Sequence, residues 1–233
     1  MGERYSRGKV RWYKLSSHLT ELFEDEALIG KIKRRLPYFY QLAELERSRA
    51  GKIGMEVGSL REKIIVALFI YKFGESNVKT DIPITEPEVD VELFGQPISI
   101  KTITGRGLSG IKLIWTVDAQ KAKEFGENYY PHCDILLVQI VWDGKGGFYH
   151  IPLDAQERLF EEMKRETLFE ETGAERYIRL PKLGTNPRGV EITQEALSRL
   201  VRGKETKVIE IEWQRSKIDY HPYKRWVDYW REG

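Results

Sequence analysis

The chain has 233 residues, enough for one large domain or for a domain with an appendage, and it can bury a sizeable core. Lys and Arg number 38 and Asp and Glu number 36, so the net charge of +2 excludes a global polycation, although a cleft lined by local Lys and Arg can still bind nucleic acid. The single cysteine, Cys133, excludes a disulfide framework and favours a reducing cytoplasm.

The first predicted elements are two helices within residues 14–50. Ser16 or Ser17 can cap a helix that ends near Ile29, and a second periodic pattern covers residues 36–49. Both patterns have polar outer faces, so we expect a helical arm or a flank of the main domain.

A loop with three glycines follows over residues 49–58 and contains Met55. Methionine is a common filler of gaps, so Met55 can fold back onto the core. The alternative is an apolar wedge that inserts between base steps of DNA.

A strong helix is predicted over residues 60–73, capped by Ser59 and ended by Gly74. Residues 64–71 are apolar all round, which predicts burial. Glu62 lies in the first turn, where the helix dipole favours a negative charge.

A β-hairpin is predicted over residues 88–102, because apolar and polar residues alternate on both sides of Gly95 and Gln96. Glycine at the first position of a two-residue loop indicates a type II′ turn at Gly95 and Gln96, with Phe94 paired to Pro97. A turn one residue earlier gives a second register, and both registers stay open.

In either register the polar residues Asp90, Glu92, Ser99 and Lys101 share one face of the hairpin. The first register places Asp90 opposite Lys101, and the second places it opposite Ser99. Two carboxylates and an ammonium on one face cost desolvation free energy unless a cation or an anionic substrate binds there.

This face suits metal-assisted hydrolysis of a phosphodiester. A hard divalent cation prefers carboxylate and carbonyl oxygens, acidifies a water and neutralises charge on the phosphate. Lys101 can orient or deprotonate the attacking water and contact phosphoryl oxygens. The alternative is an ordinary hairpin with a solvated charged face.

A glycine-rich loop over residues 102–112 directly follows Lys101, so Arg106 and Lys112 are candidates to meet phosphate or a base edge. A flexible turn with a solvated arginine is the alternative. A strand is expected at residues 111–115.

Thr116 is expected to cap the next helix, with Asp118 in its first turn as a capping charge or a metal ligand. The continuous apolar run over residues 133–142 predicts a central strand buried on both faces. Residues 143–147 should turn it into a further strand at residues 148–152.

Asp154 is expected to cap a helix, and residues 177–192 contain a polar turn between two short strands. Lys182, Asn186 and Arg188 cluster at this turn. Asn and Arg are the side chains that read adenine and guanine edges, so the turn is either a DNA-reading loop or a simple connection.

Thr193 is expected to cap a helix, and residues 207–213 alternate as an edge strand. The segment 220–231 is aromatic and basic, which predicts a packing helix pinned by Trp226 and Trp230. Stacking on bases is the alternative for this helix.

The order of elements indicates an α/β or α+β fold with a mixed central sheet flanked by helices. Within it, the hairpin resembles the PD-(D/E)xK nuclease motif, with Asp90 as the first acid and Ser99-Ile100-Lys101 where Glu/Asp-x-Lys usually stands. The chain departs from that motif because Ser99 replaces the second acid and Glu88-Val89 stands where proline is usual. It is similar to a variant found in some type II restriction endonucleases, in which another carboxylate moves in. The candidates for that carboxylate are Glu62, Glu92 and Asp118.

The resemblance implies a sequence-specific endonuclease of double-stranded DNA with a restriction-endonuclease-like core. Its catalytic residues would be Glu62, Asp90, Ser99 and Lys101. Its Mg²⁺, or another divalent cation, would be held by Asp90, Glu62 and the Ile100 backbone carbonyl, with Glu92 as an alternate. A homodimer and a cognate DNA methyltransferase as genetic partner are also implied. The compact size and the Met55 loop resemble ThaI-like enzymes, which implies a methionine wedge at a CpG-rich site.

We expect an N-terminal arm and loop over residues 1–58, a nuclease core over residues 59–170 and specificity and packing elements over residues 171–233, within one compact domain. No apolar run approaches the roughly 20 residues of a membrane span, and residues 1–9 lack the apolar core of a signal peptide, so we expect a cytoplasmic protein. One cysteine and four dispersed histidines predict no metal site of the Cys/His type.

Two other functions are open. A structure-selective nuclease such as a junction resolvase would keep the same fold, although such enzymes are usually shorter and more basic. The missing second acid at Ser99 also permits a non-catalytic DNA-binding protein on a nuclease-like core.

Overall fold

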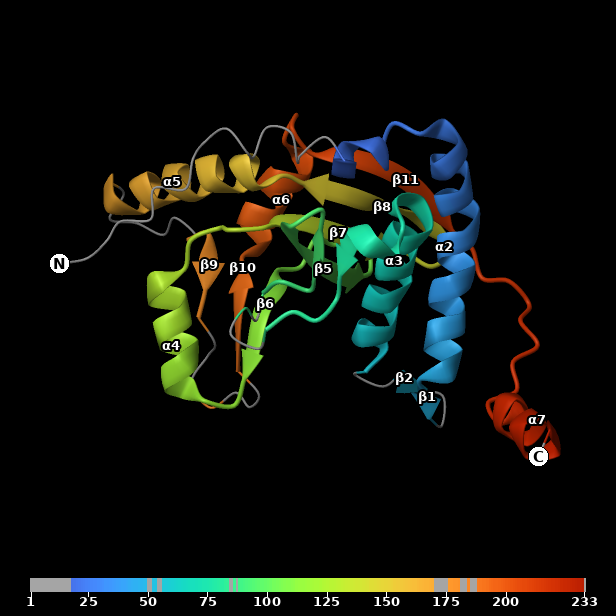
Figure 1. The fold of residues 1–233 in the computed structure, drawn as a ribbon. Coiled ribbons are helices and arrows are strands. Elements are labelled where there is room, and N and C mark those ends of the chain that lie inside the picture. The colour runs from blue at the N-terminus through green and yellow to red at the C-terminus, as the bar shows by residue number, and fades with distance from the viewer. Residues whose placement is uncertain are drawn as a thin grey trace.

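The computed structural model describes residues 18–49, 52–53, 56–83, 86, 88–169, 176–180, 184 and 188–232. Within these residues, a six-stranded sheet with the order β11-β8-β7-β5-β4-β3 forms the centre of the molecule (Figure 1). Its strands are β3 (Val78–Lys79), β4 (Val91–Leu93), β5 (Gln96–Thr104), β7 (Asp134–Ile140), β8 (Gly144–Ile151) and β11 (Lys207–Trp213). Strands β5 and β7 are parallel and the other neighbours are antiparallel, so the predicted mixed sheet is confirmed.

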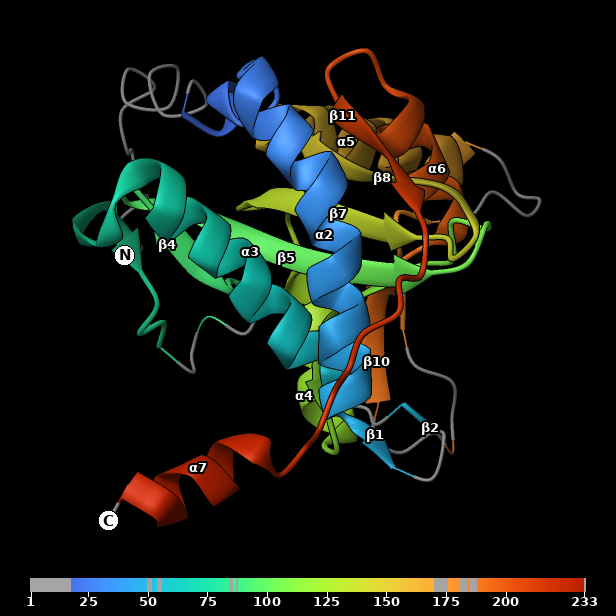
Figure 2. The same ribbon diagram turned by 90° about the vertical axis from the view of Figure 1, so that its right-hand side faces the viewer.

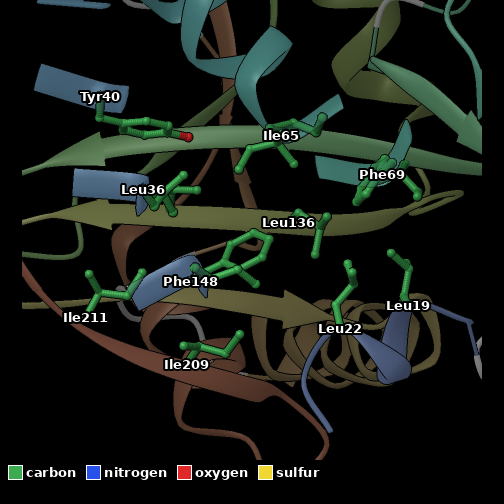
Figure 3. Packing of buried hydrophobic residues seen from close by; sticks show 14 of the residues in the cluster. Leu19, Leu22, Leu36, Tyr40, Ile65, Phe69, Leu136, Phe148, Ile209 and Ile211 are labelled. Atoms are coloured by element: carbon green, nitrogen blue, oxygen red, sulfur yellow. The ribbon is translucent and has the colours of Figure 1, made fainter. Parts of the chain in front are cut away.

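Helices cover both faces of this sheet. Helices α2 (Glu26–Glu46) and α3 (Val57–Phe73) lie over one face, and α5 (Leu153–Phe169) and α6 (Gln194–Arg202) lie on the other side (Figures 1 and 2). Strand β7 is buried along its whole length, as predicted, and its side chains alternate between the two layers. Leu136 (Figure 3) and Val138 pack with α2 and α3, whereas Ile135 and Leu137 pack with α5 and α6.

A second sheet stands beside the central one. It has the order β6-β10-β9 within the described residues and consists of β6 (Ile111–Thr116), β9 (Ile178–Arg179) and β10 (Arg188–Ile192). Helix α4 (Ala119–Asn128) packs on it through Ala122, which contacts Ile114 and Val190. The strand predicted at residues 111–115 therefore exists, but it pairs with β10 and not with the hairpin. The remaining short elements are β1 (Ser48–Arg49), β2 (Lys52–Ile53) and the 3-10 helix η1 (Glu75–Asn77).

Helix α2 is one continuous helix where the sequence predicts two, one ending near Ile29 and one over residues 36–49, so the predicted break between them is wrong. It begins after Asp25, whose Oδ1 accepts a hydrogen bond of 3.0 Å from the Leu28 N–H. Its buried residues recur at helical spacing and join the main core, so α2 is a flank of the main domain. They include Leu28 and Ile32, together with Leu36 and Tyr40, which are labelled in Figure 3. Ser16 and Ser17 lie outside the described residues.

Helix α3 begins at Val57 without a side-chain cap, so the predicted capping role of Ser59 is wrong. It ends at Gly74, whose φ of +87° is accessible to glycine, as expected. The expectation that residues 64–71 are buried all round is wrong, because only Ile65 and Phe69 are buried and Tyr71 is 63% exposed. The reason is that the helix packs on the sheet from one side, through residues such as Phe69.

The hairpin uses the earlier of the two registers. Phe94 and Gly95 form its two-residue loop and have φ values of 51° and 76°. Two positive φ values define a type I′ turn, whose twist matches that of the strands, so the predicted type II′ turn at Gly95 and Gln96 is wrong. This register places Asp90 opposite Ser99.

Other local predictions have mixed outcomes. Thr193 caps α6 by accepting a hydrogen bond of 3.2 Å from the Ala196 N–H, and β11 forms an edge strand, as expected. Helix α5 begins at Leu153, so Asp154 lies in its first turn and does not cap it. Strand β8 begins already at Gly144, within the segment expected to form a turn.

The C-terminal helix α7 (Lys224–Glu232) stands away from the sheet and its flanking helices (Figures 1 and 2). Trp226 is 58% exposed and Trp230 is 88% exposed, so the prediction that these residues pin a packed helix is wrong. The segment before α7 is fixed on α2, where Gln41 exchanges two hydrogen bonds of 2.8 Å with the backbone of Ser216.

No helix among the described residues is both long enough and apolar enough to cross a membrane.

Candidate active site

Strands β4 and β5 bring Asp90 and Lys101 together on one face of the hairpin. The Lys101 Nζ lies 3.1 Å from Asp90 Oδ2, and both side chains are largely shielded from solvent. The apolar residues Val91 and Ile98 belong to the core under α2 and α3, so the predicted separation of the hairpin into a polar and an apolar face is confirmed.

Asp90 Oδ2 is the focus of this polar face. It accepts hydrogen bonds from three successive residues of β5, namely the Ser99 hydroxyl at 3.4 Å, the Ile100 N–H at 2.6 Å and the Lys101 ammonium at 3.1 Å. Donors that converge in this way fix the orientation of the carboxylate. Oδ1 takes no part in these three contacts.

Ser99, which stands where the motif has its second acid, is fully buried. Its hydroxyl donates a hydrogen bond of 2.8 Å to the Glu88 carbonyl. Ser99 therefore ties β5 to the segment before β4, and it contributes no negative charge to the site.

Glu62 is the candidate carboxylate whose pKa responds to these charges. Burial raises the pKa of Glu62, the negative charge of Asp90 raises it further, and Lys101 lowers it. Helix α3 thus brings this carboxylate close enough to Asp90 and Lys101 to interact with both.

The other two candidate carboxylates are engaged elsewhere. Glu92 shares the face of Asp90 but lies 3.0 Å from Lys79. Asp118 caps α4 by accepting hydrogen bonds from the N–H groups of Gln120 at 2.8 Å and Lys121 at 3.2 Å. Asp118 therefore has the capping role that was one of its two predicted roles. The prediction that Thr116 caps this helix is wrong, because the N-cap residue of α4 is Asp118.

Glu88 is a charged residue of this site that the sequence interpretation passed over. It is fully buried, and burial raises the pKa of its carboxyl, while His132 and Lys101 lower it. The Tyr129 hydroxyl donates to Glu88 Oε1 at 3.4 Å. The signal was present in the sequence, because strand alternation places Glu88 on the same face as Asp90.

Glu88 also meets His132 and Cys133, which precede β7. One ligand atom from each of these three residues lies within 4.8 Å of the others. The expectation that the dispersed histidines form no metal site of the Cys/His type stays a prediction, although the parallel pairing of β5 and β7 brings these distant positions together.

The candidate DNA contacts have different surroundings. Arg106 is exposed, and its loop is held by Gln139, whose side-chain amide donates to the carbonyls of Gly105 at 3.1 Å and Arg106 at 3.2 Å. Lys112 forms an ion pair with Glu191, so a contact between Lys112 and phosphate would require this pair to break.

The remaining candidates fall outside the part of the chain that can be described in full. Met55, Lys182 and Asn186 lie outside the described residues. The backbone of Arg188 lies in β10 opposite Thr116, and its side chain is not described.

Comparisons with known proteins show the family and the fold of this chain. A family model described as "Restriction endonuclease ThaI" matches residues 22–232. A solved structure described as "Restriction endonuclease in complex with substrate DNA" is similar to this chain at 58% sequence identity and a TM-score of 0.81, over 93% of this chain and 100% of that chain. A search of curated proteins found no match.

Proposed function

This chain belongs to the restriction endonuclease ThaI family, and from that membership we propose that Asp90, Glu62 and Lys101 form its catalytic centre. The chain is a type II site-specific deoxyribonuclease that hydrolyses phosphodiester bonds of double-stranded DNA. The observation that supports the assignment of the centre is the 3.1 Å contact between Lys101 Nζ and Asp90 Oδ2, next to the electrostatically coupled Glu62.

Restriction endonucleases use divalent metal ions, and the oxygen donors at this site fit a hard cation. Asp90 offers Oδ1, which is not used by the three donors on β5. The desolvated Glu62 carboxylate would gain a positive partner. We therefore assign Mg²⁺ binding to Asp90, Glu62 and the Ile100 backbone carbonyl, with Glu92 as an alternate that would have to leave Lys79. When bound, Mg²⁺ supplies neutralising charge at the scissile phosphate and acidifies the attacking water.

Lys101 is the residue that positions the attacking water and the scissile phosphate. Its ammonium projects from the middle of β5 and is held by Asp90, so it can orient the attacking water and stabilise charge on the phosphoryl oxygens. Ser99 acts with it by keeping β5 in register, through its hydrogen bond to the Glu88 carbonyl. Glu62 supplies the carboxylate that the motif lacks at Ser99.

The DNA lies along the hairpin face and its following loop. Arg106 is exposed on that loop and contacts phosphate or a base edge. Met55, Lys112, Lys182, Asn186 and Arg188 complete the proposed set of DNA contacts, with Met55 as the apolar wedge.

A palindromic recognition site would favour a two-fold symmetric homodimer, because each subunit then cuts one strand. We place the enzyme in the cytoplasm, beside a cognate DNA methyltransferase that protects the host's own sites.

Incubation of the purified protein with a long plasmid or phage DNA tests the function. We expect discrete fragments with Mg²⁺ and intact DNA with chelator, and sequencing of the fragment ends gives the recognition site. Cleavage that continues in chelator would contradict the metal assignment. Tight duplex binding without cleavage at any temperature would favour the non-catalytic alternative.

A further inference from the structure

A second set of potential metal ligands lies beside the proposed catalytic centre. Glu88, His132 and Cys133 place a carboxylate oxygen, an imidazole nitrogen and a thiol sulfur within 4.8 Å of one another. Glu88 is 0% exposed and Cys133 is 1% exposed, whereas the side chain of His132 is 47% exposed. The set therefore reaches from the protein interior to solvent through its histidine.

Glu88 Oε2 is a buried acceptor whose requirement for a partner is not met among the described residues. This atom is buried and accepts no hydrogen bond from any residue that the structure describes. The His132 Nδ1 lies 3.4 Å from it, and the Tyr129 hydroxyl donates to the other oxygen, Oε1. A buried carboxylate oxygen without a donor is costly, and a bound cation removes that cost.

We propose that Glu88, His132 and Cys133 bind a borderline-soft divalent cation of the Zn²⁺ class. Thiolate and imidazole are ligands that Zn²⁺ prefers, and a tetrahedral ion held by three side chains keeps its fourth position for water. Mg²⁺ prefers oxygen ligands and near-octahedral geometry, so it does not compete for this set. The proposal goes beyond DNA cleavage, because the ligands differ from those assigned to Mg²⁺.

The bound ion would join two parts of the fold. Glu88 precedes β4, and His132 and Cys133 precede β7, so the ion cross-links the hairpin to the central strand. The Glu88 carbonyl already accepts the Ser99 hydroxyl at 2.8 Å. Occupation of the site therefore stabilises the native state and holds the segment that leads into Asp90.

The test uses Co²⁺ as a spectroscopic substitute for Zn²⁺, added to the purified full-length protein without DNA. We expect a thiolate-to-cobalt charge-transfer band in the near ultraviolet and intense visible bands of a tetrahedral site. The Asp90→Ala variant should retain these bands, because Asp90 belongs to the other site. The Cys133→Ser variant should lose the charge-transfer band.

His132→Ala guards against a misfolded Cys133→Ser variant, since His132 is exposed and its removal should not disturb the core. We expect His132→Ala to weaken Zn²⁺ binding by more than about tenfold, measured by competition with a chromophoric chelator. His18→Ala serves as the matched control, because His18 is a partly exposed histidine away from this set, and it should bind Zn²⁺ as wild type does.

Three results would overturn the proposal. They are weak octahedral Co²⁺ spectra in the wild type, a thiolate band that survives in Cys133→Ser, or equal Zn²⁺ affinity in His132→Ala and wild type. None of these results would bear on Mg²⁺-dependent DNA cleavage. The cleavage assay with Mg²⁺ and chelator therefore tests the proposed function independently of the Zn²⁺ proposal.

Discussion

The ammonium of Lys101 lies 3.1 Å from Asp90 Oδ2, diagonally across β4 and β5, because Asp90 stands opposite Ser99. The same oxygen also accepts the Ile100 N–H at 2.6 Å. Asp90 is therefore held in one orientation by the backbone as well as by a side chain. A carboxylate that is positioned before substrate arrives loses little free energy when it binds a cation.

The first prediction concerns Asp90. We expect Asp90→Asn to lower the rate of DNA cleavage by at least about 10³-fold, because the amide keeps the size of the side chain but loses the charge that binds the cation. Binding to a duplex should persist in a gel-shift assay. The matched control is Asp154→Asn, which changes an exposed carboxylate on α5 outside the proposed site and should cleave within a few-fold of wild type. An Asp90→Asn enzyme that cleaves at the wild-type rate would refute the assignment.

The second prediction concerns Lys101. Lys101→Met removes the ammonium that positions water and phosphate, so we expect single-turnover cleavage to slow by about 10²–10⁴-fold while the affinity for DNA changes little. Lys79→Met is the control, because Lys79 is a lysine of the same sheet that forms its ion pair with Glu92 and not with Asp90. Equal effects of the two substitutions would indicate a general electrostatic role of these lysines.

Strand alternation was sufficient to predict the polar face of the hairpin. The side-chain period of two places Asp90, Ser99 and Lys101 together in either register, so a wrong turn did not matter. The sequence predicts the wrong turn because Phe94 adopts a positive φ, which is uncommon for a bulky residue. The backbone conformation of Phe94 therefore depends on tertiary packing and not on the local sequence.

Long-range pairing limited the rest of the prediction. The meeting of Glu88 with His132 depends on the parallel pairing of β5 with β7, which no local pattern encodes. The pairing of β6 with β10 is equally distant in sequence. At the C-terminus, the aromatic pattern of α7 predicts a helix correctly, but the pattern cannot say which surface the helix contacts.

The third prediction follows from the raised pKa of Glu62, which is caused first by burial and then by the charge of Asp90. A carboxyl with a raised pKa keeps its proton to a higher pH, so protons compete with Mg²⁺ at a pH where an ordinary carboxyl is already ionised. The Mg²⁺ concentration for half-maximal cleavage should therefore rise as the pH falls, measured between about pH 5 and 8. In Glu62→Gln the requirement for Mg²⁺ should be higher at every pH and depend less on pH. A wild-type requirement that does not vary with pH would contradict this role.

The fourth prediction concerns stability at the buried Glu88. Burial raises its pKa above the ordinary value of 4.5, so the folded state binds this proton more tightly than the unfolded state does. The stability from this group is present below the unfolded pKa and is lost as the pH rises through the folded pKa. In chelator, Glu88→Gln should therefore be more stable than wild type near neutral pH, by about 1–3 kcal/mol. The difference should shrink at acidic pH.

Urea denaturation of both proteins at an acidic and a neutral pH measures this difference. A wild type that is the more stable protein at neutral pH in chelator would show that the Glu88 carboxylate is satisfied without a cation. Added Zn²⁺ should reverse the order, because it binds and stabilises only the wild-type ligand set.

The last prediction concerns the buried ion pair that fixes α3, and hence Glu62, against α2. The Arg61 Nη2 lies 2.6 Å from Glu44 Oε1, and the side chains are only 8% and 5% exposed. The same Glu44 oxygen accepts the Trp142 indole N–H at 2.9 Å. Glu44→Gln leaves the Arg61 charge buried without a counter-ion, so we expect the free energy of unfolding to fall by about 3–5 kcal/mol. Because Arg61 adjoins Glu62, cleavage should also slow.

The matched control is Asp154→Asn, which breaks an exposed ion pair with Arg158 and should change stability by less than about 1 kcal/mol. The double variant Glu44→Leu with Arg61→Met should recover much of the lost stability, because no charge then remains buried without its partner. Recovered stability with cleavage still slow would show that the pair positions Glu62 as well as holding the fold. A Glu44→Gln protein as stable as the Asp154→Asn control would mean that water reaches Arg61 and that the pair does not fix α3.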